Sequence, residues 1–140
     1  NAERLSSAAA VGAFKRLARE EQSHIEFIEK QIALLDGGKP FSAEAPPALG
    51  GEGFFAARAE SEKIDQTVAE AMVADLPVLR MAYLIERDFA EFYESSATKE
   101  TGEAQRILKM LAAWERGHEA LFKQMHDKAF EEYEQMPWGG

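Results

Sequence analysis

The 140-residue chain contains no cysteine, which excludes several functions at once. Disulfide scaffolds, thiolate catalysis, cysteine-ligated zinc and iron–sulfur clusters all need a thiol. No apolar stretch approaches the roughly 18–20 residues that a membrane-spanning helix requires. Basic residues are also few, because 16 Lys and Arg stand against 25 Asp and Glu, for a net charge of −9. This balance argues against nucleic acid and membrane as partners, and since no targeting signal is visible we expect a cytoplasmic protein.

Strand-like alternation of apolar and polar residues is absent as well, whereas helical periodicity is strong. Long segments carry apolar residues at alternating steps of three and four, the period of an amphipathic helix. With 46% hydrophobic residues and ordinary length, the chain is expected to form one globular domain over 1–140. The sequence predicts an all-α fold with three long helices and one short helix, over about 2–35, 59–74, 76–99 and 103–136.

Glycine, proline and a capping residue set the expected helix ends. Gly37 and Gly38 stop the first helix, and residues 37–57, rich in proline and glycine, form a long connection. Asp75 is expected to cap the next long helix, with Pro77 in its first turn, where proline is tolerated.

Each long helix has one stripe of residues that we expect to face the interior. In chain order the stripes comprise Val11, Phe14, Leu17, Ala18, Glu21, His24, Ile25, Ile28, Ile32 and Leu35; then Leu79, Ala82, Tyr83, Glu86, Phe89, Ala90 and Tyr93; then Ile107, Leu111, Trp114, Glu115, His118, Leu121, Phe122, Met125 and Ala129.

Two copies of Glu-x-x-His interrupt these apolar stripes, at Glu21 with His24 and at Glu115 with His118, and Glu86 interrupts the stripe between them. Residues three apart on a helix share a face, so each copy aims a carboxylate and an imidazole at one point. A carboxylate in an apolar interior costs several kcal/mol unless a positive charge meets it. The pattern therefore favours a bound metal pair, and carboxylate with imidazole suits iron, manganese or zinc. Alternatively, each Glu lies at the edge of its stripe and reaches water.

Three motifs carry a resemblance to a known family. Residues 17–24 read Leu-Ala-Arg-Glu-Glu-Gln-Ser-His, residues 82–93 read Ala-Tyr-Leu-Ile-Glu-Arg-Asp-Phe-Ala-Glu-Phe-Tyr, and residues 111–118 read Leu-Ala-Ala-Trp-Glu-Arg-Gly-His. In this order they resemble the ferritin-like superfamily, and within it the rubrerythrin-like proteins, over about Ala8 to Tyr133. Such bundles hold a di-iron or di-manganese site between helices that supply Glu and Glu-x-x-His.

The resemblance implies a ferritin-like helical bundle with a role for each of these residues. Glu21 and Glu115 would be terminal or bridging carboxylates. His24 and His118 would each cap one metal ion, and Glu86 would be the third-helix ligand.

Tyr93 lies two turns beyond Glu86 and, by the same resemblance, would donate a hydrogen bond near the metals. The alternative for Tyr93 is an ordinary tyrosine at the edge of the core.

The sequence departs from the family in three places. The family's first helix supplies a further Glu, whereas the twenty residues before Glu21 belong to the same predicted helix as Glu21 itself. We expect an additional N-terminal segment to provide it; alternatively, a partner subunit provides it or the site is incomplete. We also expect a homodimer, with or without exchanged helices. Rubrerythrins proper have a second Glu where this chain has Phe89, and a cysteine-ligated rubredoxin iron site that is impossible here. Both departures weaken the expectation of an internal electron relay.

The resemblance implies two metal ions, expected to be iron, with manganese or zinc also compatible with the ligands. The implied chemistry is of oxidase or peroxidase (or ferroxidase) type, with O₂ or peroxide as the small-molecule substrate and an external protein as electron donor. Two alternatives stay open: iron storage or delivery without turnover, and a metal-free helical interaction module.

Overall fold

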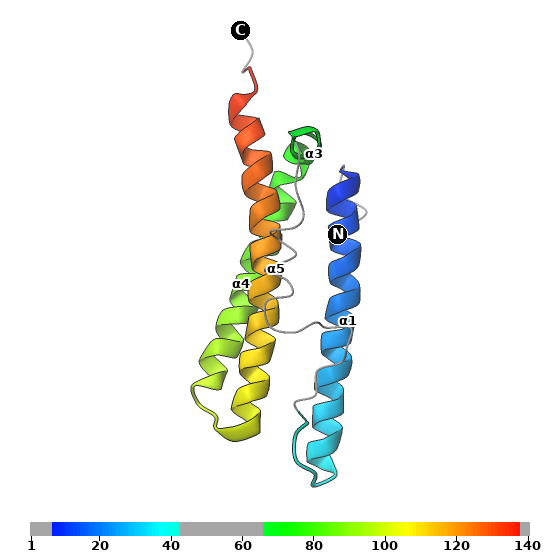
Figure 1. Ribbon diagram of the computed structural model, residues 1–140, viewed down its shortest axis with the longest axis vertical. Coiled ribbons are helices and arrows are strands. Elements are labelled where there is room, and N and C mark those ends of the chain that lie inside the picture. The colour runs from blue at the N-terminus through cyan, green and yellow to red at the C-terminus, as the bar shows by residue number, and fades with distance from the viewer. Residues whose placement is uncertain (1–6, 43–65, 138–140) are drawn as a thin grey trace.

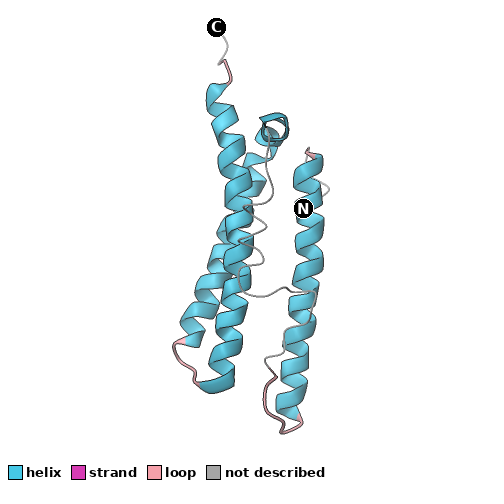
Figure 2. Cartoon of the chain, in the orientation of Figure 1, coloured by secondary structure: helices cyan, strands magenta, loops and turns pink. Residues whose placement is uncertain are grey.

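The computed structural model describes residues 7–42 and 66–137, and in these ranges it contains helices and no strand (Figures 1 and 2). In chain order the elements are α1 (Ala8–Asp36), α3 (Gln66–Met72), the 3₁₀ helix η3 (Val73–Asp75), α4 (Leu76–Ala97) and α5 (Gly102–Gln135). None of these helices is long and apolar enough to cross a membrane. The prediction of an all-α fold is confirmed.

The predicted helices agree closely with those of the structure. α5 matches its predicted range almost residue for residue, and α4 ends at Ala97 instead of Lys99. Three predicted segments lie outside the described residues: the start of the first helix at 2–6, the start of the short helix at 59–65, and 43–57 of the long connection.

α4 and α5 pack against each other, and α1 runs alongside this pair (Figure 1). The ring centroids of Phe14 and Phe122 are 4.8 Å apart, and those of Phe27 and Trp114 are 5.6 Å apart. Residue numbers rise along α1 while they fall along α5, so these two helices are antiparallel. α4 and α5 form a second antiparallel pair joined by a short turn.

The turn between α4 and α5 depends on a glycine and an amide side chain. Gly102 has a φ of 62°, in the left-handed region that glycine adopts without steric cost. The amide of Gln105 donates to the carbonyl oxygens of Ala97 and Glu100, both at 3.0 Å. These bonds connect the end of α4 to the first turn of α5.

The start of α1 is attached to the start of α4 through Asp75. The backbone N–H of Ser7 donates to Oδ2 of Asp75 at 2.9 Å, while Oγ of Ser7 caps α1 by accepting from the N–H of Ala10. Asp75 is 1% exposed. It occupies the predicted N-cap position of α4 but makes no side-chain capping bond there, because its carboxylate is turned toward Ser7. That detail of the prediction is wrong.

Apolar side chains form two separate clusters along the bundle. One consists of Ala10, Ala13, Met72, Leu79, Ala82, Phe122, Met125 and Ala129. The other consists of Phe27, Ile107, Leu111 and Trp114. On α1 and on α5 the two Glu-x-x-His motifs occupy the residues between these clusters. The fold therefore places the buried Glu86 and Glu115 in a central layer with apolar packing at both ends.

The predicted stripes are partly wrong about which side chains are buried. Ile25, Ile32, Leu35 and Phe89 are about half exposed. α1 packs on α5 through a strip that includes Ala13, His24 and Phe27, so the other edge of the predicted stripe faces outward.

Candidate metal centre

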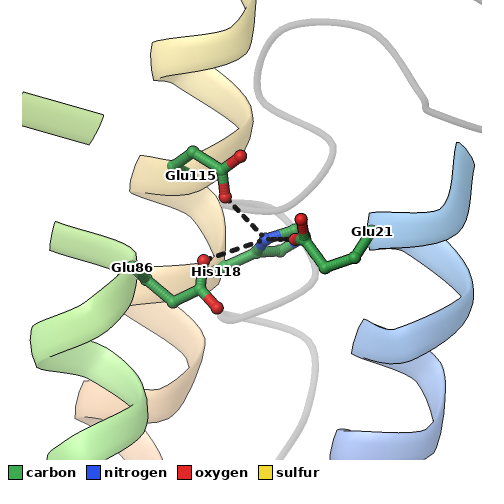
Figure 3. Close-up of side chains that lie close together, drawn as sticks. All are labelled: Glu21, Glu86, Glu115 and His118. Carbon is green, nitrogen blue, oxygen red and sulfur yellow. Dashed lines mark hydrogen bonds and ion pairs between the residues drawn. The ribbon is translucent and has the colours of Figure 1, made fainter. Parts of the chain in front are cut away.

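All three long helices contribute acidic side chains to one point of the central layer (Figure 3). Glu21 comes from α1, Glu86 from α4, and Glu115 and His118 from α5. Because Glu115 and His118 are three residues apart, they share one face of their helix. One possible ligand atom from each of the four residues lies within 4.8 Å of the others. We call these four residues the carboxylate cluster.

The His118 ring stands at the centre of the carboxylate cluster. Its Nδ1 lies 3.0 Å from Oε1 of Glu21, 3.3 Å from Oε2 of Glu115 and 3.4 Å from Oε2 of Glu86. The side chains of Glu86, Glu115 and His118 are 6%, 3% and 1% exposed, whereas that of Glu21 is 34% exposed. Three carboxylates, two of them buried, thus converge on one imidazole nitrogen.

His24, the fifth predicted ligand, lies beside this cluster. Its Nδ1 is 3.4 Å from Oε2 of Glu21 and 3.5 Å from Oε1 of Glu115. Its ring stacks on Trp114, with centroids 4.7 Å apart and planes 14° from parallel, and lies 5.4 Å from the ring of His118. The structure therefore brings four of the predicted ligands within 4.8 Å of one another and places His24 against two of them.

Glu20 is a member of the site that the sequence analysis missed. Its Oε2 lies 3.1 Å from Nε2 of His118, on the side of the ring away from the three other carboxylates. The residue stands next to Glu21, but neighbours on a helix point about 100° apart, so the stripe pattern assigns it to a different face. The pair of adjacent glutamates, Glu20 and Glu21, is the sequence feature that could have indicated this contact.

The two most buried carboxyl groups of the cluster, Glu86 and Glu115, have very different pKa values. Burial raises the pKa of Glu86 to about 7, and the charge of Glu115 acts in the same direction. Burial also opposes ionisation of Glu115, but the nearby side chains of His118, His24 and Glu86 outweigh it and lower the pKa to about 2. Burial would lower the pKa of His118, yet the surrounding carboxylates raise it far above its usual value. The cluster thus concentrates negative charge around a histidine.

Polar atoms of the cluster remain unsatisfied, and this fits a bound cation. Within the described ranges, Oε1 of Glu21, Oε2 of Glu86 and both ring nitrogens of His24 are buried without a hydrogen-bond partner. The two oxygens lie close to Nδ1 of His118 but outside hydrogen-bond geometry. One ring N–H cannot satisfy three carboxylates, whereas a metal ion accepts several oxygen and nitrogen ligands together. The donor set suits iron, manganese or zinc.

Tyr93 packs at the edge of the Phe27 and Trp114 cluster. Burial raises the pKa of its hydroxyl, and the negative charges of Glu115 and Glu21 add to the effect. These charges place Tyr93 in the electrostatic field of the carboxylate cluster. In the described part of the chain its hydroxyl makes no hydrogen bond, so its role as a donor to the site stays a prediction.

The Rubrerythrin family model matches residues 2–126, a range that contains the whole carboxylate cluster together with His24 and Glu20. Comparison with curated proteins and with solved structures finds no match to this chain.

Proposed function

The chain belongs to the rubrerythrin family, and we propose that it is a dinuclear iron or manganese protein with redox chemistry of oxidase or peroxidase type. Its substrate would be O₂ or peroxide, and an external protein would supply electrons, because these 140 residues contain no cysteine to hold a rubredoxin-type iron. The observation that carries the proposal is the convergence of Glu21, Glu86, Glu115 and His118 from three helices. Rubrerythrins bind di-iron centres, and this cluster has the donors for one.

The charge of the site supports two divalent ions. Glu20, Glu21, Glu86 and Glu115 provide four negative charges when all are ionised, and two divalent ions provide four positive charges. The histidines can then be neutral, the form in which imidazole binds metals. Without ions, charge balance must come from protonated histidines and a protonated Glu86, which agrees with the raised pKa values of His24, His118 and Glu86.

A groove between α1 and α4 supports access by a small oxidant. It has a volume of about 340 Å³, and Glu21 and Glu86 line it together with apolar side chains such as Phe14 and Ile85. Bound iron would supply electrons to O₂ or peroxide. The chain would hold the ions through its carboxylates and histidines, and its two apolar clusters would limit entry of water from the ends of the bundle.

The double substitution Glu115→Ala with His118→Ala tests the site assignment. It removes two donors from one face of α5, so we expect stoichiometric metal to be lost when protein purified without chelator is analysed for metal content. The matched control is Glu131→Ala with His126→Ala, which removes the same residue types from α5 outside the cluster and should retain metal. Two ions per chain in the Glu115 and His118 variant would show that the site lies elsewhere.

Storage or delivery of iron without turnover is the second candidate. It is favoured by Phe89 in place of the family's additional Glu and by the absence of cysteine. The kinetics separate the two functions: a peroxidase consumes peroxide over many cycles per metal, whereas a storage protein shows one oxidation event per ion bound. A metal-free interaction module would contain no stoichiometric metal at all.

We further propose that the protein works as a homodimer in which a second copy covers the outer faces of α1 and α4. Support comes from exposed apolar side chains of these helices that lie outside the groove: Ile25, Ile32, Leu35, Phe89 and Phe92. Apolar residues grouped along two helices are typical of a contact surface. Light scattering coupled to gel filtration should give the mass of two chains, and Phe89→Glu should lower it. A wild-type monomer at micromolar concentration would contradict the dimer.

A further inference from the structure

The two histidines of the site differ in the hydrogen-bond partner of Nε2, the ring nitrogen that faces away from Glu115. For His118 this nitrogen is Nε2, which lies 3.1 Å from Oε2 of Glu20, while Nδ1 faces the other carboxylates. When Nδ1 gives up its proton to bind an ion, Nε2 keeps its hydrogen and donates it to Glu20. A carboxylate in this position fixes the orientation of the ring and makes the ligating nitrogen more basic.

His24 has no such partner. Its Nε2 is buried and lacks a hydrogen-bond acceptor in residues 7–42 and 66–137. Its ring is held by stacking on Trp114, an apolar surface that fixes the plane but accepts no hydrogen bond from the ring edge. Its Nδ1 has two carboxylates within 3.5 Å, from Glu21 and Glu115, whereas His118 has three on Nδ1 alone.

The sequence explains this difference. The residue before the first motif is Glu20, and its side chain reaches across to His118 on the opposite helix. The residue before the second motif is Trp114, and its side chain reaches back to His24. Both motifs have the same Glu-x-x-His spacing. The residue before the first motif gives a carboxylate to the histidine of the second, whereas the residue before the second motif gives an indole face to the histidine of the first.

We propose that the two metal positions are unequal, and that the position at His118 binds first and more tightly than the position at His24. Glu20 acts as a positioning residue for the first position. The proposal rests on the proposed metal-binding function and adds an order of binding to it. Loss of a carboxylate that supports a metal-bound histidine typically weakens metal affinity by about 10- to 100-fold. The difference between the two binding steps is expected to be at least of this size.

Zinc titration of protein labelled with ¹⁵N in its histidine rings tests the order, because zinc is diamagnetic and each ring reports separately. The chain has three histidines, and single His→Asn variants assign their signals. The first equivalent of zinc should shift the His118 ring, the second should shift the His24 ring, and His126 should stay unchanged. Shifts of both rings together, or of His24 first, would overturn the order. No ring shift at stoichiometric zinc would instead overturn the proposed metal site.

Glu20→Gln tests the cause of the order. Competition with a chelator should show the first zinc step weakened by about 10- to 100-fold, with the second step much less affected. The control is Glu29→Gln, which removes an equal charge from an exposed position of α1 and should leave both steps unchanged. An unchanged first step in Glu20→Gln, in a protein with a wild-type circular dichroism spectrum, would show that Glu20 does not position His118.

Discussion

Glu86→Gln should stabilise the metal-free protein at neutral and alkaline pH, because the folded chain resists ionisation of Glu86. Burial raises the pKa of this carboxyl from 4.5 to about 7. Below pH 4.5 the folded and unfolded chains both hold the proton, and the penalty is absent. As the pH rises from 4.5 to 7 the unfolded chain loses the proton while the folded chain keeps it, so stability falls. Each pKa unit is worth about 1.4 kcal/mol, so the penalty reaches about 3 kcal/mol above pH 7.

A glutamine side chain stays neutral at every pH and can still donate a hydrogen bond to Glu115, as protonated Glu86 does. Urea unfolding with a chelator present should therefore give wild-type and Glu86→Gln similar free energies at pH 4.5, and a variant more stable by up to about 3 kcal/mol at about pH 8. Glu91→Gln, an exposed position on α4, should change stability by less than about 0.5 kcal/mol at both pH values. A Glu86→Gln protein less stable than wild type at the higher pH would refute the reasoning.

Three further substitutions test how the bundle is held together, each by equilibrium urea unfolding. Trp114→Ala should cost about 3–5 kcal/mol, because it empties a buried position that contacts His24 and Phe27; a loss below about 1 kcal/mol would show that the stack contributes little. Asp75→Ala should cost about 1–3 kcal/mol by leaving the N–H of Ser7 buried and unpaired, and no change would contradict that attachment. Arg116→Gln should cost less than about 1 kcal/mol, because its ion pairs with Glu94 and Glu119 lie at the surface; a larger loss would indicate a role beyond these pairs.

The ligands of the site could be predicted from sequence because their signal is local. Glu21 and Glu115 each stand three residues before a histidine and within an apolar stripe, and Glu86 interrupts a third stripe. A charged residue in a stripe that is otherwise apolar indicates burial, and burial of several such residues indicates a cation. The helix ends were predictable for a similar reason, since glycine and proline act on the backbone near their own position.

Features that depend on which helices are neighbours could not be predicted. Glu20 contacts His118 across 98 residues of sequence, and no local pattern reports that contact. Asp75 had the sequence of a helix cap, but the proximity of Ser7 gave its carboxylate another partner. The exposure of Ile25 and Phe89 likewise depends on which edge of each helix faces α5, and a helical period alone cannot choose between two edges of a wide stripe.

Anomalous scattering from crystals soaked in zinc would test the central claim most directly. We predict a strong peak at the zinc absorption edge about 2.0–2.2 Å from a ligand nitrogen of His118 and from carboxylate oxygens of Glu21, Glu86 and Glu115, and a weaker second peak at His24. Full occupancy at another position, with no peak among these four side chains, would contradict the assignment of the carboxylate cluster as a metal centre.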